Sequence, residues 1–263
     1  MRKFAIFLKL SWQNTLAYRE ESVVWFILEA VPLTYMISFW INSRTRGNIS
    51  ESQASSLIFY QITSLFVSRF TATHYEEWVI DEIKDGNISN ALIKPIPYRI
   101  YLLASEVAWK LFGLVYLLPI FICLLPFLSQ LKGLNLIIGQ IPFVVVIFSL
   151  AFAQRFLVSW LIAISAFWFE QAQSLVHLKW MLEGILGGSW LPIYFYPHWF
   201  QTIARITPFY YWYYLPINSL THSLNSFEKI VNIAFPISWI IALFFLGNWL
   251  WHKAIRKFTA VGR

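Results

Sequence analysis

Long apolar segments alternate with short polar ones along most of this 263-residue chain. A helix needs about 20 largely apolar residues to cross the roughly 30 Å of hydrocarbon in a bilayer. Segments that meet this requirement are 23–42, 57–75, 102–128, 137–164, 175–195 and 230–251. No internal repeat or low-complexity linker divides the chain. The pattern predicts an all-α polytopic membrane protein with six transmembrane helices, as a single domain over residues 1–263.

The composition agrees with contact between the protein and lipid. Apolar residues make up 58% of the chain and charged residues 13%, whereas a soluble domain is roughly 45–50% apolar and about 25% charged. A soluble fold of this size could not bury so much apolar surface. The net charge is +7. Because the basic residues flank apolar segments, the expected partner is anionic membrane lipid, not nucleic acid.

Lys and Arg are unevenly distributed between the two sides of the predicted membrane. With the N-terminus inside, 13 of them fall on the inner side, including Arg155 and Lys179 near the fourth loop, and five on the outer side. Cytoplasmic loops carry an excess of basic residues. The count predicts that both termini are cytoplasmic.

Residues 1–20 form a basic, amphipathic segment before the first predicted span. Its apolar positions recur at helical spacing and are Phe4, Phe7, Leu8, Trp12 and Leu16, with Lys9 and Gln13 opposite. Such a helix either lies in the membrane interface or packs on protein. Its basic character and its position next to a span favour the interfacial helix.

The inner loop after the second span is the most acidic part of the chain. Gly86 can end one short helix in the left-handed conformation, and Pro95 and Pro97 stop a second one. Two short helices over residues 76–97 would form a rigid docking surface for a soluble partner; the alternative is a solvated loop. The residues expected to take part are Glu77, Trp78, Asp81, Glu82, Ile83, Asp85, Gly86, Ile88, Leu92, Lys94 and Pro95.

An aromatic segment interrupted by glycines and prolines, residues 184–220, separates the last two predicted spans. Broken backbone at membrane depth is tolerated only where protein buries it or where it lines a cavity. The pattern indicates a re-entrant segment in the outer leaflet, with Trp199 and the aromatic run 210–214 at headgroup level. It would form an outer gate or exit path, or an aromatic belt that only anchors the protein. Its marker residues are Gly187, Gly188, Pro192, Pro197, Pro208, Phe209 and Pro216.

Several charged residues fall within or near the predicted spans, where a charge is costly and marks a functional candidate. The pairs Glu106–Lys110 and Lys179–Glu183 are spaced i, i+4 and could each neutralise themselves on one helix face. The intramembrane candidates that remain are Glu29, Arg69 and Arg155.

The sequence contains no nucleotide-phosphate loop, no metal-ligand spacing among its histidines and no nucleophile motif. We therefore expect no catalytic residue, no metal site and no cofactor on this chain.

The chain resembles the ABC-2-type permeases, in particular a small bacterial subgroup with six transmembrane helices and a separate ATPase subunit. The similarity lies in four places. They are Tyr18 and Arg19 before the first span; Asp81, Ile83, Gly86, Ile88, Ser89, Leu92, Lys94 and Pro95 in the inner loop; Gly187, Pro192, Pro197, Pro208, Phe209 and Pro216 after the fifth span; and Phe258, Val261 and Gly262 at the end. Glu170 departs from the family, which has an uncharged residue there.

The resemblance implies a transport subunit, not an enzyme, in an ATP-binding cassette exporter of the bacterial inner membrane. Two ATPase copies would bind ATP and Mg²⁺, and the inner loop would couple them to the spans. A second permease, identical or related, would complete the substrate path. The alternatives are a membrane-embedded lipid-modifying enzyme and an ion-driven secondary transporter.

Overall fold

The computed structural model describes residues 2–17, 19–129 and 138–257. Within these ranges the regular structure is helical and contains no strand, which confirms the predicted all-α class. The α-helices are α1 (Arg2–Ala17), α2 (Arg19–Thr45), α3 (Glu51–Thr71), α4 (Tyr75–Lys84), α5 (Ile88–Leu92), α6 (Tyr98–Ser129), α7 (Ile141–Ser165), α8 (Gln173–Ile185), α9 (His198–Ile206), α10 (Tyr214–Thr221) and α11 (Ser226–Lys257). The 3-10 helices are η1 (Ile138–Gln140), η2 (Ile193–Phe195) and η3 (Pro208–Tyr211).

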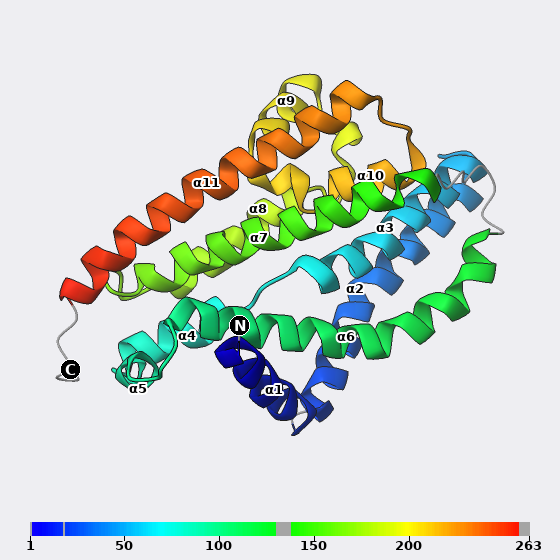
Figure 1. Ribbon diagram of the computed structural model, residues 1–263. Coiled ribbons are helices and arrows are strands. Elements are labelled where there is room, and N and C mark those ends of the chain that lie inside the picture. Colours follow the sequence, from blue (N-terminus) through cyan, green and yellow to red (C-terminus); the bar gives the residue numbers. More distant parts are fainter. Residues whose placement is uncertain (1, 18, 130–137, 258–263) are drawn as a thin grey trace.

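The short helices gather toward the two ends of a bundle of long ones (Figure 1). α7 and α11 pack against each other, α1 packs on α6, and α2 packs on α3. α4 and α5 lie at the end of the bundle where α11 finishes, whereas the turn between α2 and α3 lies at the opposite end (Figure 1). The loop predicted to dock a partner therefore lies on the same side as the end of α11.

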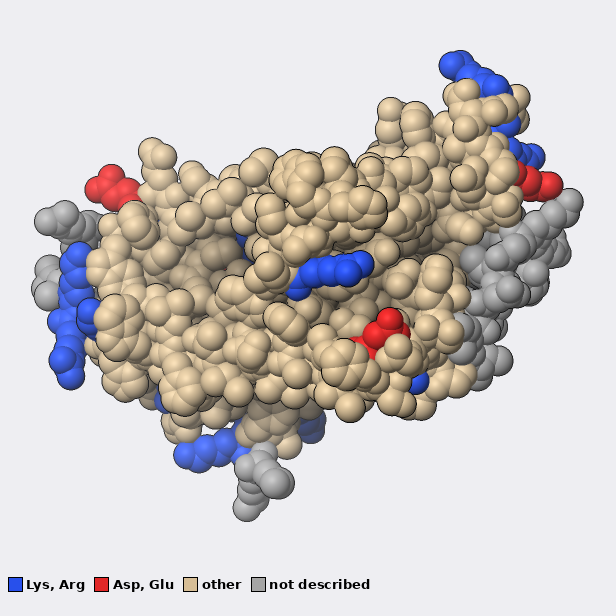
Figure 2. All heavy atoms as spheres, turned by 90° about the horizontal axis from the view of Figure 1, so that it is seen from above, with Lys and Arg blue, Asp and Glu red and all other residues tan. Residues whose placement is uncertain are grey.

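Among the described residues, α7 and α11 are the two helices that are both long enough and apolar enough to cross a membrane. Much of α11 is exposed, and its exposed surface carries large apolar side chains such as Ile241, Phe245 and Trp249. Figure 2 shows a broad surface of uncharged residues, with most charged side chains toward the edges of the molecule. Apolar surface of this extent is expected to contact lipid.

The length of three further helices is also compatible with a membrane crossing. α2 has 27 residues, α3 has 21 and α6 has 32. At a rise of 1.5 Å per residue, even the shortest of them extends about 32 Å. Five of the six predicted spans therefore correspond to helices of sufficient length, and that all of these cross the membrane remains a prediction.

The prediction of a fifth continuous span over 175–195 is wrong. α8 ends at Ile185 after 13 residues, a length of about 20 Å, too short to cross the hydrocarbon alone. Gly188 follows with a φ of +78°, a conformation that favours glycine and ends regular helix. From there the chain continues as η2, α9, η3 and α10. Apolar residues continue past Ile185, but the α-helical backbone does not.

The placement of Arg155 near an inner loop is also wrong, whereas the Lys179 ammonium does reach the connection between α3 and α4 at the Thr73 carbonyl. α7 runs without a break from Ile141 to Ser165, and Arg155 lies in its interior. Both basic side chains are buried. The loop that follows α7 spans 166–172 and includes Glu170, which is exposed. Removing Arg155 lowers the inner-side count from 13 to 12 against five, so the charge bias persists.

The apolar face of α1 packs on protein. Phe7 and Tyr101 meet edge-to-face at 5.9 Å between ring centroids, and Trp12 meets Phe112 at 6.2 Å. Ile6 and Leu10 point outward and are exposed. Leu16, at the end of the face that the sequence marked, is exposed as well. Lipid contact of α1 is therefore open to Ile6, Leu10 and Leu16, whereas α6 covers Phe7 and Trp12.

Candidate functional site

The segment between α3 and α6, residues 75–97, folds into a knob of two short helices, α4 and α5. Gly86 joins them with a φ of +74°, in the left-handed region that glycine adopts readily. Ile83 and Ile88 turn inward and pack with Tyr98 and Trp160 in one hydrophobic cluster. The knob is therefore firmly attached to α6 and α7, and its helices are those that the sequence predicted.

The outward face of the knob combines apolar and acidic side chains. Its exposed residues include Trp78, Asp81, Lys84, Asp85, Leu92, Ile93 and Pro95, and Ile93 is 82% exposed. Two other predicted docking residues are held by α6. Glu82 accepts a hydrogen bond of 2.6 Å from the Tyr98 hydroxyl, and the Lys94 ammonium lies 3.8 Å from the centroid of the Tyr101 ring.

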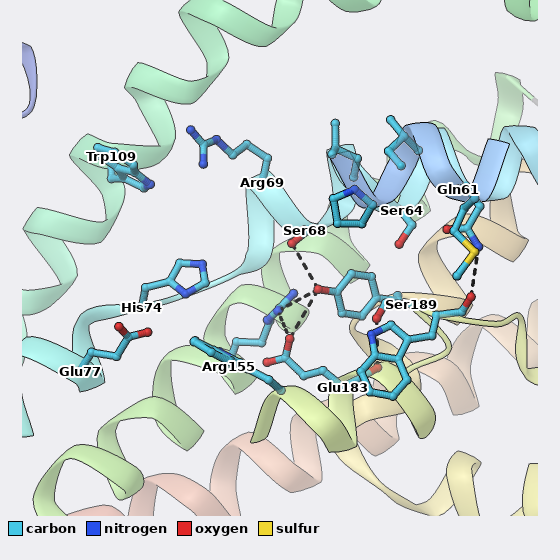
Figure 3. A pocket seen from close by; sticks show the side chains of 17 residues that line it. Gln61, Ser64, Ser68, Arg69, His74, Glu77, Trp109, Arg155, Glu183 and Ser189 are labelled. Carbon is cyan, nitrogen blue, oxygen red and sulfur yellow. Dashed lines mark hydrogen bonds and ion pairs between the residues drawn. The ribbon is translucent and has the colours of Figure 1, made fainter. Parts of the chain in front are cut away.

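A cavity of about 590 Å³ opens beside the knob, between α2, α3 and α8 (Figure 3). This volume is in the range of small-molecule sites. Its apolar lining consists of Pro32, Leu33, Met36, Leu65, Trp109, Trp180 and Trp190. Its polar lining consists of Gln61, Ser64, Ser68, Arg69, His74, Glu77, Arg155, Glu183, Ser189 and Tyr213. The cavity offers aromatic surfaces together with hydroxyl, amide and charged groups.

Two of the predicted residues line this cavity near the knob. The Arg69 guanidinium lies 5.4 Å from the centroid of the Trp109 ring. Glu77 lies in the first turn of α4 and is half-buried. It lines the cavity and is not part of the exposed docking face. Burial raises the pKa of the Glu77 carboxyl, and the adjacent Glu76 raises it further. The Glu29 side chain, the third intramembrane candidate, lies outside the described part of the structure.

Arg155 is the centre of a buried polar cluster at the floor of the cavity. Its guanidinium donates to Glu183 Oε2 at 2.5 Å, to Thr71 Oγ1 at 2.8 Å and to the Tyr213 hydroxyl at 3.1 Å. It also lies over the Trp212 ring, 5.2 Å from the centroid. The cluster joins the end of α3, the middle of α7, α8 and the segment after η3.

Lys179 forms a second buried ion pair one turn earlier on α8. Its ammonium is paired with Glu76 of α4 and donates to the Thr73 carbonyl at 3.1 Å and to Ser159 Oγ at 3.3 Å. Glu183 Oε1 lies 3.9 Å away. The predicted self-neutralising pair Lys179–Glu183 is therefore only a long contact, because both residues have closer partners on other helices.

The other predicted pair is confirmed. Lys110 Nζ and Glu106 Oε2 on α6 lie 3.5 Å apart. Lys110 also donates to the Ala72 carbonyl, and the His74 backbone N–H donates to Glu106 Oε1 at 3.4 Å. This pair fastens α6 to the connection between α3 and α4.

The aromatic run 210–214 is part of the protein core and packs on protein instead of lipid headgroups, and its depth in the membrane remains a prediction. Trp212 is fully buried and donates through Nε1 to Gln154 Oε1 at 3.0 Å. Tyr213 reaches the cluster around Arg155. Trp199 on α9, in contrast, is 66% exposed. The helices α3 and α7 cover the aromatic run, whereas nothing in the described structure covers Trp199.

The outer marker residues also differ in their surroundings. Tyr60 of α3 donates to the Gly188 carbonyl at 2.9 Å, and the Tyr214 N–H donates to the Gly187 carbonyl at 3.1 Å. These bonds tie the glycines to α3 and to the start of α10. Pro192, Pro208 and Pro216 are buried, Phe209 is partly buried and Pro197 is exposed.

The sequence did not reveal which charges pair. Glu76 and Lys179 are 103 positions apart and Arg155 and Glu183 are 28 apart. The available signal was that charges inside apolar helices need partners. It marks Arg155, Lys179 and Glu183 without matching them, and it does not mark Glu76, which lies in the acidic inner loop. Within the described residues, no group of three or more His, Cys, Asp or Glu side chains is placed to hold a metal ion.

One comparison with known proteins finds a match. A family model described as "ABC-2 family transporter protein" matches residues 28–262 of the chain. No curated protein and no solved structure matches it.

Proposed function

The chain belongs to the ABC-2 family of transporters, and we propose that it is the permease subunit of an ATP-driven exporter whose ATPase is a separate chain. On this proposal two ATPase copies, which hold ATP and Mg²⁺, dock on a pair of permeases. The second permease is identical or related, and both termini face the cytoplasm of a bacterial inner membrane.

The outward face of the knob is the observation that carries this proposal. Trp78, Leu92 and Ile93 offer apolar contacts, and Asp81 and Asp85 give the face a negative rim. Ile83 and Ile88 are buried against α6 and α7. A displacement of the knob is therefore transmitted to these long helices through packed side chains. A soluble partner with an apolar groove and a basic rim fits this face.

The cavity supports a transport role. It lies between α2, α3 and α8, beside the knob, and combines three tryptophans with hydroxyl, amide and charged groups. Binding sites of small molecules have this mixture of apolar walls and a few placed polar groups. On this proposal the cavity is a stage in the path of the transported molecule, and the segment 184–220, whose residues 210–214 are in the protein core, closes it on the outer side.

The test is a charge reversal on the knob. We expect the chain carrying Asp81→Lys and Asp85→Lys to lose copurification with the co-expressed ABC ATPase encoded nearest to it. The matched control is Glu51→Lys, an exposed reversal at the opposite end of the bundle. The proposal fails if the knob variant binds the ATPase like the wild-type chain.

The same preparation separates the two alternatives. Transport into vesicles without ATP, driven by an ion gradient alone, would identify a secondary transporter. Turnover of lipid by the purified chain without an ATPase would identify an enzyme.

A further inference from the structure

Buried charges connect the knob to the wall of the cavity through one lysine. Lys179 lies on α8, and its ammonium is paired with Glu76 of the knob helix α4. The remaining donors reach the Thr73 carbonyl and Ser159 Oγ. The lysine thereby holds the first turn of α4 against α7 and α8.

A second carboxylate lies within reach of the same ammonium. Glu183 follows Lys179 by one helical turn, and its Oε1 lies 3.9 Å from Lys179 Nζ. Glu183 Oε2 accepts from Arg155, but Oε1 has no hydrogen-bond partner among the described residues. Glu183 is nine-tenths buried and lines the cavity. A buried carboxylate oxygen that accepts no hydrogen bond is unfavourable. A hydrogen bond to Glu183 Oε1 from any donor that reaches it is therefore stabilising.

Two kinds of donor can reach Glu183 Oε1. One is the ammonium of Lys179, whose three donors are in use, so that it must release one of its partners Glu76, Thr73 and Ser159. The other is a hydroxyl or amine of a molecule in the cavity. Release of Glu76 would detach α4 from α8, whereas a molecule in the cavity leaves this contact in place, so occupation of the cavity and attachment of α4 can depend on each other.

We propose that Lys179 is the positioning residue that couples the knob to the cavity, by exchanging between Glu76 and Glu183. In the state described here Lys179 holds Glu76, and the cavity can accept a molecule with a hydrogen-bond donor at Glu183 Oε1. In the second state Lys179 fills that position, displaces the donor and frees α4. This inference rests on the proposed function for its role in transport, but the exchange is a property of the chain alone.

The coupling is reciprocal by thermodynamic necessity. A donor bound at Glu183 Oε1 favours the state in which α4 is held. A partner that pulls α4 away from α8 favours the state in which Lys179 occupies Glu183 and the donor is expelled. Docking on the knob thereby lowers the affinity of the cavity for its contents.

The outer segment is placed to respond to the same exchange. The Tyr213 hydroxyl donates to Ser68 Oγ at 3.2 Å and lies 3.5 Å from Glu183 Oε2. Ser68 lines the cavity (Figure 3). The Tyr213 hydroxyl contacts both Ser68 and Glu183, so a group attached at position 68 is close to the Glu183 carboxylate. This position can deliver a donor of known chemistry.

The experiment attaches a donor at position 68 and measures hydrogen exchange in α4. The full chain in lipid nanodiscs carries Cys123→Ala, which removes its single cysteine, and Ser68→Cys. Aminoethyl methanethiosulfonate forms a disulfide with this cysteine that carries an aminoethyl group with its ammonium, and methanesulfinate leaves. Methyl methanethiosulfonate reacts in the same way but adds only a methylthio group, which has no donor. We expect the ammonium to slow amide exchange over 75–84 by about fivefold or more, the lower end of typical couplings, and the methylthio group to leave it unchanged.

Two paired variants decide whether Lys179 carries the effect. Glu76→Gln with Lys179→Met removes the exchanging pair without leaving an unpaired charge, and we expect both reagents to give the same exchange in α4. Glu106→Gln with Lys110→Met removes a different buried pair, and we expect the difference between the reagents to persist. Melting temperatures show that each variant is folded.

The proposal is overturned if the two reagents give equal exchange in the parental chain. It is also overturned if their difference survives in the Glu76–Lys179 variant or disappears in the Glu106–Lys110 variant. These measurements need no ATPase. A normal response of α4 in a chain that no ATPase binds would therefore leave the exchange intact and refute the proposed function instead.

Discussion

Replacing Arg155 with methionine removes a charge from the centre of the protein. Arg155 is 2% exposed and is bound to Glu183, Thr71 and Tyr213. Methionine is unbranched and fills irregular space without a charge. The Glu183 carboxylate would keep only the Tyr213 hydroxyl and the distant Lys179 ammonium, at 3.9 Å, as neighbouring stabilising groups within the described structure.

The magnitude follows from the charge that is left behind. Removing one partner of a buried ion pair costs about 3–5 kcal/mol, whereas removing both charges is often close to neutral. Lys179 offsets part of the loss, so we expect about 3 kcal/mol for Arg155→Met. At roughly 2–4 °C per kcal/mol for a chain of this size, the melting temperature falls by about 6–12 °C. Adding Glu183→Gln recovers most of this loss.

The assay is the loss of the monodisperse peak in size-exclusion chromatography after heating in detergent, detected by tryptophan fluorescence. Four chains complete the cycle: the wild type, Arg155→Met, Glu183→Gln and the double variant. Arg256→Met is the control, since Arg256 is exposed near the end of α11 and surface changes stay within about 0.5 kcal/mol. The reasoning is refuted if Arg155→Met has the same melting temperature as the wild type. It is also refuted if the double variant melts at a lower temperature than Arg155→Met.

Three further variants test particular contacts. Gly188→Ala places a Cβ 3.0 Å from the Tyr60 hydroxyl at a φ of +78° and should lower stability by about 1–2 kcal/mol, measured by the same melting assay. Gly247→Leu should cost about 1–3 kcal/mol, because even a Cβ there would lie 2.9 Å from Trp160 Cδ1 and would force α11 away from α7. Ile88→Ala removes a fully buried side chain of the knob and should cost about 2–5 kcal/mol. In Ile88→Ala, hydrogen exchange should become faster mainly in α4 and α5. Unchanged exchange in these helices would contradict the packing of Ile88 in the knob.

The knob was predictable because its shape depends on neighbours in sequence. A glycine after one short amphipathic helix and two prolines after the next leave the backbone few choices. The same local reasoning identified the long apolar helices and the Glu106–Lys110 pair, whose members are one turn apart on α6. Which face of the knob turns inward depended on Trp160 of α7, far away in the chain.

Local reasoning failed where apolar residues had two possible environments. The run 210–214 is aromatic whether it faces lipid headgroups or packs against α3 and α7, because both environments favour the same side chains. The prediction that α8 continues past Ile185 failed for a similar reason, since hydropathy reflects the environment of side chains and not the backbone conformation. Gly188 carried the contrary signal, and its positive φ confirms it.

By itself, the sequence determined the helical class, the apolar helices, the glycine-hinged knob and the set of residues whose charges needed partners. Only the tertiary structure decided that Glu76 pairs with Lys179, that Arg155 pairs with Glu183, and that a cavity reaches Glu183. The physical reason is that propensity and hydropathy act over a few residues. Pairing of buried charges depends instead on which helices meet, and that is settled by the packing of the whole chain.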